Sequence, residues 1–217
     1  ATSQAAPLRR VHVDGELWLS EGLTPHWSAG GFMRSSKVDG PLHFGTQQQF
    51  LVRNAELAQG ADGKNMNYVF VGVSNAPSNS TDGRISTIEA TPRVAEKPYL
   101  VERLGAWSIC VPQFVYGAVG IANSTACERS VPMADVYVAC AGDTAATINA
   151  GLAAKSALLL TPGLYELDAP IVLQADGFVV LGLGFATLLA TSGLPALVVA
   201  GAGVRLGGVF LEAATAA

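Results

Sequence analysis

Charged residues, long apolar runs and an excess of basic residues are all scarce or missing in this chain of 217 residues. Only 14% of the residues are charged, and 13 Lys and Arg against 17 Asp and Glu leave a net charge of −4. Without a basic footprint, we expect no nucleic-acid partner. No apolar run approaches the roughly 18–20 residues that a helix needs to cross a bilayer, so the sequence predicts no membrane span. Residues 1–7 lack the basic stretch and apolar core of a signal peptide.

Metal ligands and cofactor-binding motifs are also sparse. The three histidines, His12, His26 and His43, do not cluster with cysteines at metal-ligand spacing. Two Gly-x-Gly segments, at 182–184 and 201–203, lack the third glycine and the following helix of a dinucleotide-binding turn. We therefore expect neither a metal nor a cofactor.

Short apolar runs separated by Gly, Asp or Ser dominate the C-terminal part of the chain. Leu159, Val180 and Val199 lie in three of these runs, 21 and 19 residues apart. A repeat of about 20 residues is typical of a solenoid whose turns stack around one core. Residues 145–154 have a short helical pattern that precedes the first of these strands. The pattern predicts a right-handed parallel β-helix over 136–217, with a short N-terminal helical cap and these three residues stacked.

The composition of the chain changes twice along its length. Residues 1–77 carry short strands between polar or glycine corners, which predicts the end portion of a first β-helix. Residues 78–135 contain four prolines, at positions 92, 98, 112 and 132, and isolated strands, which predicts a crossover before the second β-helix of 136–217. The predicted fold class is therefore all-β, with pieces of two right-handed parallel β-helices joined by a long crossover. Since solenoids need capping turns and neither end offers one, we expect further polypeptide to cover both ends.

Two features favour a secreted, extracellular protein. Asn79 and Asn123 each begin an Asn-Ser-Thr acceptor sequence for N-glycosylation in a loop-like stretch, although such triplets also arise by chance. The three cysteines cannot all pair with one another. Cys110 lies in an apolar strand and is expected to be a buried free thiol. Cys127 lies in a polar insert, and a disulfide to Cys140 would pin that insert to the next domain.

Two stretches carry a resemblance to a known family. The residues Gly-Asp-Thr-Ala-Ala-Thr-Ile-Asn-Ala at 142–150 and Thr-Pro-Gly-Leu-Tyr at 161–165 resemble the opening of a pectate-lyase-like right-handed β-helix domain. The first part, with Gly-Gly-Phe-Met at 30–33 and Gln-Gln-Gln at 47–49, is similar to secreted β-1,3-glucanases with two β-helices side by side. The resemblance implies an extracellular setting and a polysaccharide as partner. It implies no catalytic residue, because no catalytic motif of a characterised enzyme matches here.

A polar cluster in the first part is the candidate glycan-binding site. Side chains alternate in and out along each strand of a β-helix. Amides that point outward on successive turns would line a groove for sugar hydroxyls, whereas amides that point inward would form structural ladders at the corners. Both alternatives remain open at this point. The candidates are Gln47, Gln49, Arg53, Asn54, Asn65 and Asn67.

Two classes of function fit these observations. The first is a secreted carbohydrate-directed β-helix protein that binds, hydrolyses or lyses a polysaccharide. Its catalytic residues remain unknown, although Glu166 and Asp168 have the spacing of a carboxylate pair and Trp18 or Trp27 could stack on a sugar. The alternative is a non-catalytic extracellular structural protein, such as a component of a matrix, a wall or a surface appendage.

Overall fold

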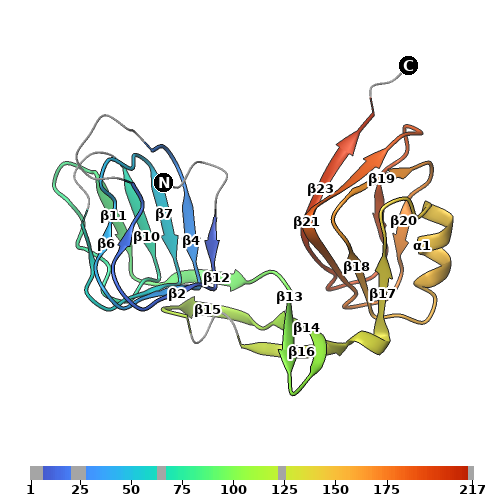
Figure 1. Cartoon of the computed structure of the whole chain (residues 1–217), viewed down its shortest axis with the longest axis horizontal. Coiled ribbons are helices and arrows are strands. Elements are labelled where there is room, and N and C mark those ends of the chain that lie inside the picture. The colour runs from blue at the N-terminus through green and yellow to red at the C-terminus, as the bar shows by residue number, and fades with distance from the viewer. Residues whose placement is uncertain (1–6, 21–27, 63–66, 122–125, 215–217) are drawn as a thin grey trace. The chain divides into compact units, whose positions relative to one another are not determined.

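The chain folds into two compact units, shown in the computed structural model of Figure 1. The structure describes residues 7–20, 28–62, 67–121 and 126–214. Unit 1 comprises Ala1–Ala95 and Gln113–Ala126, and unit 2 comprises Glu96–Pro112 and Cys127–Ala217. The chain therefore passes from one unit to the other three times.

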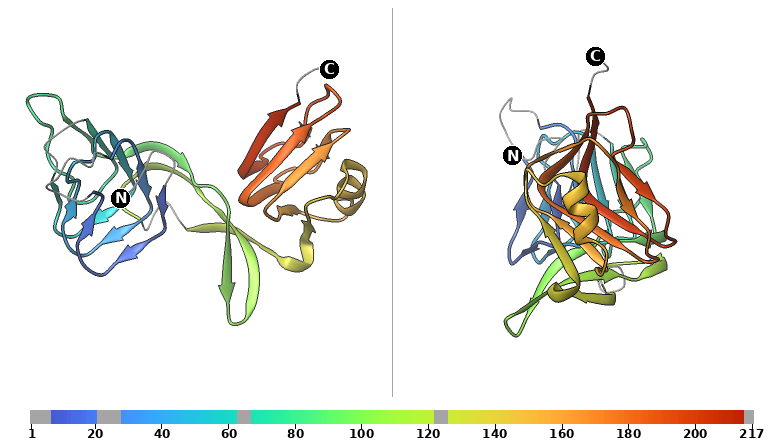
Figure 2. Two further views of the ribbon diagram at one scale, coloured as in Figure 1. Left: turned by 45° about the horizontal axis from the view of Figure 1, so that its top comes forward. Right: turned by 90° about the vertical axis from the view of Figure 1, so that its right-hand side faces the viewer.

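Unit 1 contains a parallel β-helix whose described strands form three sheets (Figure 2). Each coil of the chain contributes one strand to a sheet, and the next coil adds its strand in parallel register. The strands are short, with two to four residues each. The first sheet has β1 (Leu8–Arg9), β4 (Phe32–Arg34), β7 (Phe50–Arg53), β10 (Tyr68–Val71) and β11 (Ile85–Ile88); the second has β2 (His12–Val13), β5 (Lys37–Val38) and β8 (Glu56–Leu57); the third has β3 (Leu17–Trp18), β6 (Leu42–His43) and β9 (Ala61–Asp62).

The core of unit 1 forms because every second residue of a strand points inward. Met33, Val52 and Phe70 are paired on successive coils, and each is almost fully buried. Phe44 adds an aromatic stack with Tyr68, with ring centroids 4.1 Å apart. Burying a side chain of this size stabilises the fold by roughly 1.5–3 kcal/mol, so a column repeated over several coils holds the stack together.

The segments that connect the two β-helices contain antiparallel strands, unlike the coils on either side. In unit 1, β12 (Thr91–Ala95) pairs with β15 (Phe114–Ala118). In unit 2, β14 (Ala106–Pro112) lies between β13 (Tyr99–Arg103) and β16 (Cys127–Pro132). The strands that the sequence predicted as isolated are therefore paired with one another.

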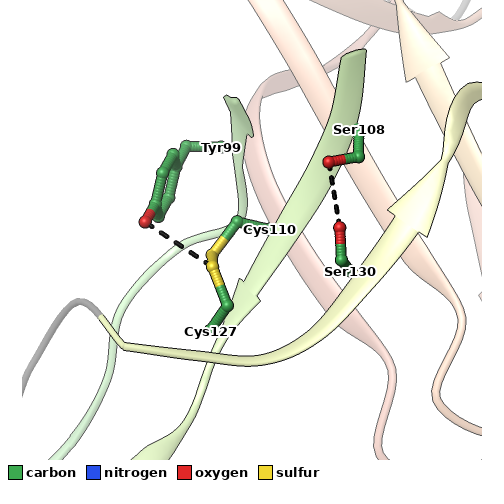
Figure 3. The surroundings of a disulfide bond; sticks show 5 residues. All are labelled: Tyr99, Ser108, Cys110, Cys127 and Ser130. Carbon is green, nitrogen blue, oxygen red and sulfur yellow. Dashed lines mark hydrogen bonds between the residues drawn. A yellow bond between two sulfur atoms is a disulfide. The ribbon is translucent and has the colours of Figure 1, made fainter. Parts of the chain in front are cut away.

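A disulfide joins Cys110 of β14 to Cys127 of β16 (Figure 3). The predicted bond between Cys127 and Cys140 is wrong, as is the prediction of a free thiol at Cys110. Cys110 and Cys127 lie on neighbouring antiparallel strands with their Cα atoms 5.5 Å apart, a separation that suits a disulfide. Cys140 follows β17 (Val136–Ala139) as an exposed free cysteine. The sequence could not show that the chain leaves and re-enters unit 2 between the two bonded cysteines.

Unit 2 contains a second parallel β-helix. Its larger sheet has the order β17, β18, β21, β19. The first part of the long strand β21 pairs with β18 and its last part pairs with β19, while β23 pairs with both parts. A second sheet pairs β20 with β22. The predicted fold class, two right-handed parallel β-helices joined by a crossover, is confirmed. The strands not yet bounded are β18 (Ala157–Leu160), β19 (Leu164–Leu167), β20 (Ile171–Leu173), β21 (Val179–Ala190), β22 (Leu197–Val199) and β23 (Arg205–Ala213).

The stacking register in unit 2 differs from the predicted one. Val180 pairs with Leu158 rather than with Leu159, so the prediction for this coil was wrong by one residue. Val199 does not stack on Val180 at all, because β22 belongs to the other sheet and places Val199 beside Leu173. Val136, Ala157, Val179 and Arg205 are successive partners in one column. The last coil of that column is longer than the others, and a fixed repeat of 20 residues cannot reproduce it.

The corner at 161–165 fastens one coil of unit 2 to the coil before it. Tyr165 is fully buried, and its hydroxyl donates to the carbonyl of Ala139 at 2.9 Å. The hydroxyl of Thr161 donates to the same carbonyl at 3.0 Å. This Thr-Pro-Gly-Leu-Tyr segment therefore positions the second coil on the first.

The helix α1 (Ala145–Gly151) covers one edge of the second β-helix. Thr144 caps its N-terminus by accepting a hydrogen bond from the backbone N–H of Thr147 at 3.2 Å. From the helix, the Asn149 amide donates to the carbonyl of Pro170 and accepts from the N–H of Val172, each at 2.9 Å. One side chain thus pairs with the edge of β20 as another strand would, which protects an edge that is otherwise open to pairing.

We expect Asn149→Ala to destabilise unit 2 by about 1–3 kcal/mol, because it leaves the carbonyl of Pro170 and the N–H of Val172 without their partner. Chemical unfolding followed by circular dichroism measures the change. Asn149→Asp keeps the acceptor and loses the donor, so it should fall between the wild type and Asn149→Ala. Equal stability of the alanine variant and the wild type would contradict this role.

Within the described residues, no helix has the length and apolar character required to cross a membrane. The α-helix α1 is seven residues long, and the 3-10 helix Met133–Asp135 is three.

Candidate functional site

Three of the predicted glycan-binding residues share the outer face of the sheet β1–β4–β7–β10–β11, here called the arginine face. Gln49 and Asn67 directly precede Phe50 and Tyr68, which are paired on neighbouring coils, and both Gln49 and Asn67 are exposed. Arg53 lies at the end of β7 and is partly buried. The two amides and the guanidinium group therefore point outward from adjacent coils. Asn65 lies outside the described residues.

Gln47 and Asn54 are corrections to the predicted groove, because both are fully buried. The amide of Gln47 donates to the carbonyl of Gly30 at 2.6 Å. Asn54 donates to the carbonyl of Ala118 at 3.0 Å and accepts from the hydroxyl of Thr91 at 2.9 Å. These two side chains satisfy backbone and hydroxyl groups inside unit 1, so the structural alternative holds for them and they are not exposed to a sugar.

The inward position of Asn54 follows from the corner that it occupies. Asn54 has a positive φ of 48°, a left-handed conformation that Asn adopts more readily than most residues. Ser35 on the coil before and Gly72 on the coil after have φ values of 49° and 60°. At Gly72, a Cβ atom would lie 2.3 Å from the carbonyl oxygen of Ala118, so only glycine fits there. One bend thus recurs directly after β4, β7 and β10 and ends these three strands at corresponding positions.

Three arginines form a column along the arginine face. Arg9, Arg34 and Arg53 are paired on three successive coils. The guanidinium groups of Arg9 and Arg53 lie 5.6 and 5.9 Å from the ring centroid of Phe32, within the range of a cation–π interaction. Of these three arginines, only Arg53 was predicted as a site residue from the sequence. The intervals between the three arginines along the chain are unequal, so no fixed repeat reveals them. Arg9 and Arg34 are recognised only when the coils are aligned by their strand pairing.

The arginine column concentrates positive charge. Burial, followed by repulsion from Arg9, Arg53 and Arg10, lowers the pKa of Arg34 to about 9. Burial and then repulsion from Arg9 also lower the pKa of Arg53. Guanidinium groups carry several N–H donors in a planar arrangement, so this face offers donors to hydroxyl or carboxylate oxygens. Gln49 and Asn67 add both donors and acceptors at its edge.

The remaining predicted residues lie elsewhere. Asn79 is exposed, and its side-chain oxygen accepts a hydrogen bond from the N–H of Thr87 at 2.5 Å. Asn123 lies outside the described residues, as does Trp27. Glu166 and Asp168 are both exposed at the end of β19. The two carboxyl groups of a glycosidase pair have different roles and need different environments. Glu166 and Asp168 are both exposed to solvent, so their environments do not differ in this way.

A hollow of about 520 Å³ lies in unit 2 between α1 and β20. Asn149, Lys155 and Gln174 supply its polar groups, and Leu152 and Phe178 supply much of its apolar wall. Both ends of the Asn149 amide are already bound to β20. The Lys155 ammonium donates to the carbonyl of Ala134 at 2.7 Å. Two of its polar groups therefore hold the fold, and the hollow brings no pair of acids together.

The chain is similar to known proteins in both sequence and fold. Residues 136–217 match the family model of the LAM55 pectate lyase-like domain. The whole chain is also similar to an exo-β-1,3-glucanase of Streptomyces sp. (strain SirexAA-E / ActE), with 38% identity over 218 residues that cover 98% of this chain. The predicted resemblance to pectate-lyase-like β-helices and to twin-β-helix β-1,3-glucanases is confirmed.

Two solved structures give the same result. The structure of sacteLam55A from Streptomyces sp. SirexAA-E matches with a TM-score of 0.86 and 37% identity over 97% of this chain. A variant of sacteLam55A in complex with glucose matches with a TM-score of 0.87 and 38% identity. The chain spans 36% of the length of the curated glucanase and 39% of each solved chain.

Proposed function

We propose that this chain is part of a carbohydrate-active protein that acts on β-1,3-glucan. The observation that carries the proposal is the 38% identity to an exo-β-1,3-glucanase over 98% of this chain, across both β-helical units. The glucose complex of the similar structure supports a sugar as ligand. Glu166 and Asp168 are both exposed and nothing in their surroundings distinguishes one from the other. Because this chain spans 36% of the curated glucanase, the proposed hydrolysis is assigned to the full-length protein.

The contribution of this chain is to bind sugar through the arginine face. Gln49, Arg53 and Asn67 point outward there and can donate to and accept from glucan hydroxyls. A neutral hydrogen bond contributes only about 0.5–1.5 kcal/mol, so several groups must act together. Phe32 is held by cation–π contacts to Arg9 and Arg53 and adds an apolar patch beside them.

The activity is tested on the full-length protein with β-1,3-glucan as substrate and release of glucose as readout. Polygalacturonate serves as the comparison substrate, because the matched family model is named pectate lyase-like. Release of glucose from β-1,3-glucan alone is the expected result. Absence of turnover and of binding on both polymers would contradict the proposal and leave the structural protein as the remaining hypothesis.

Replacing the exposed amides tests the assignment of the face. We expect Gln49→Ala and Asn67→Ala each to weaken oligosaccharide binding by about 0.5–1.5 kcal/mol, with the fold unchanged because both side chains are exposed. Isothermal titration with a soluble β-1,3-linked oligosaccharide measures the loss. Gln174→Ala is the matched control, since Gln174 is an exposed amide directly after β20 in unit 2, outside this face. Losses no larger than that of the control would remove the arginine face from the binding site.

We also propose that the protein is secreted. The disulfide between Cys110 and Cys127 supports an oxidising compartment. Asn79 is exposed within its acceptor sequence, which supports glycosylation there and, by the same sequence motif, at Asn123. Peptide mass mapping of the secreted protein with and without glycosidase treatment tests both sites.

A partner of this chain is polypeptide that covers the last coil of unit 2. Leu211 occupies the same inward column as Leu188, which is fully buried, yet Leu211 is exposed. Val199 likewise is paired with the buried Leu173 and is itself exposed. Inward-facing apolar residues on an open coil need cover, which supports another β-helical coil stacked over them. Protection of these residues from hydrogen exchange in the full-length protein is the expected result.

A further inference from the structure

Phe185 of unit 2 has a backbone conformation that bulky residues rarely adopt. Its φ is 64°, in the left-handed region, where the Cβ atom of an L-residue approaches the following carbonyl oxygen too closely. Such strain persists only where the surrounding structure imposes it, and it is concentrated at sites that bind ligands. The position of Phe185 in the fold shows what imposes it here.

The strain arises where β21 carries more residues than the strand beside it. Residues 182–185 of β21 lie opposite the single residue Gly208 of β23. The two backbones meet there, because a Cβ atom on Gly182 would lie 2.3 Å from the carbonyl oxygen of Gly208. The extra residues are therefore accommodated on the outside of the coil, and they carry Phe185 out of the sheet. Extra residues of this kind re-aim a side chain and are common next to active sites.

The ring of Phe185 projects outward between two described coils. It stacks on Phe210 of the following coil, with ring centroids 5.7 Å apart and an interplanar angle of 22°, yet Phe185 remains 76% exposed. On the preceding coil, Pro162 lies against the backbone next to Phe185, since a Cβ atom on Gly184 would be 2.8 Å from its Cγ atom. A coil added after β23 would stack on Phe210 and leave the outer edge of Phe185 open. A ring that is already supported loses little freedom when a ligand contacts it.

Oxygen acceptors flank the ring on the outer side of the same strands. The hydroxyl of Thr187 donates to the carbonyl of Phe185 at 3.0 Å, which leaves its lone pairs free to accept. Leu164 is paired with Thr187 from the preceding coil and is 47% exposed, and Glu166 follows on the same side of β19 with an exposed carboxylate. These outer side chains form one surface, here called the phenylalanine face: Leu164, Glu166, Phe185, Thr187 and Phe210.

We propose that the phenylalanine face is a second carbohydrate-binding surface, in unit 2, for neutral polysaccharide. A neutral hexose unit places its apolar C–H side on Phe185, and its hydroxyls donate to Thr187 and Glu166. Polymers of uronic acids are disfavoured, because their carboxylates would meet those of Glu166 and Asp168 on the same strand. The proposal rests on the proposed function for the choice of polysaccharide as ligand, and it adds a surface whose role is to retain the polymer.

The test is a pull-down of the full-length protein on insoluble β-1,3-glucan, with bound and free protein quantified over a range of polymer concentrations. Phe185→Ala is expected to weaken retention by about three- to tenfold, because it removes the projecting ring. Phe185→Tyr keeps an aromatic ring and is expected to retain most of the binding. Tyr116→Ala is the matched control, since Tyr116 is an aromatic residue of similar exposure, 67%, on β15 in unit 1.

Phe185→Gly distinguishes a binding role from a structural one. Glycine adopts a positive φ without strain, so relief of the strain offsets the loss of the contact with Phe210. The denaturant midpoint of this variant is therefore expected to stay at or above that of the wild type, whereas its retention on the polymer falls as far as that of Phe185→Ala. A lower midpoint would show that another segment of the full-length chain packs on Phe185, and it overturns the inference.

The outcomes separate this inference from the proposed function. Glucose release from a soluble β-1,3-linked oligosaccharide is measured on the same variants, since this readout does not require retention on an insoluble polymer. Unchanged retention of Phe185→Ala, or an equal loss in Tyr116→Ala, overturns the inference and leaves the proposed function intact. Retention on polygalacturonate that depends on Phe185 as strongly as retention on β-1,3-glucan also overturns it. Failure of the wild type both to bind the polymer and to release glucose overturns both.

Discussion

Replacing Asn54 by alanine is expected to lower the free energy of unfolding by about 3–4 kcal/mol. About 1 kcal/mol arises from placing alanine at a positive φ, and the rest from removing the partner of the buried carbonyl of Ala118 and hydroxyl of Thr91. Equilibrium denaturation measures the change. Asn54→Gly restores the backbone freedom without the hydrogen bonds and should recover about 1 kcal/mol of the loss.

Asn75→Ala is the matched control for this position. Asn75 also has a positive φ, of 58°, but its side chain is exposed. Its replacement should therefore cost only the backbone contribution of about 1 kcal/mol. An effect of Asn54→Ala no larger than that of Asn75→Ala would show that the buried hydrogen bonds do not stabilise unit 1.

Removal of the disulfide is expected to have the second largest effect. Cys110 and Cys127 are 17 residues apart, and a bond that closes a loop of this length stabilises a fold by about 3 kcal/mol. The closed loop contains Gln113–Ala126, the whole segment by which the chain returns to unit 1. In a variant with both cysteines replaced by serine, we therefore expect loss of protection in β15 as well as lower overall stability.

Hydrogen exchange of β15 and denaturant unfolding together measure this effect. Cys140→Ser is the control, because Cys140 is an exposed free thiol and its replacement should leave both measurements unchanged. A double variant that unfolds at the wild-type denaturant concentration would contradict a stabilising role for the bond. Loss of stability without loss of protection in β15 would place that role outside the returning segment.

The amide candidates show how far a sequence pattern can locate a site. Gln47 and Gln49 are two residues apart, and a simple strand alternation would place both on the same side. The corner before β7 instead buries Gln47 and exposes Gln49. Asn54 is buried for a related reason, since the left-handed bend after Arg53 turns its side chain toward Thr91 and Ala118. Corner geometry decides these positions, and the alternation rule does not extend through a corner.

The sequence by itself determined the fold class, because its signals are local. Short apolar runs, glycine corners and the Thr-Pro-Gly-Leu-Tyr segment each act within a few residues, and together they specify strands that can be buried only by stacking coils. Only the tertiary structure decided which residues of different coils are in contact. Coil lengths vary, so the partner of Val199 is Leu173 and the rings of Trp18 and His43 come together from different coils. The disulfide likewise depends on a segment that leaves unit 2 and returns. Such pairings follow from hydrogen bonds between coils and from the path of the chain, and neither is encoded in a short stretch of sequence.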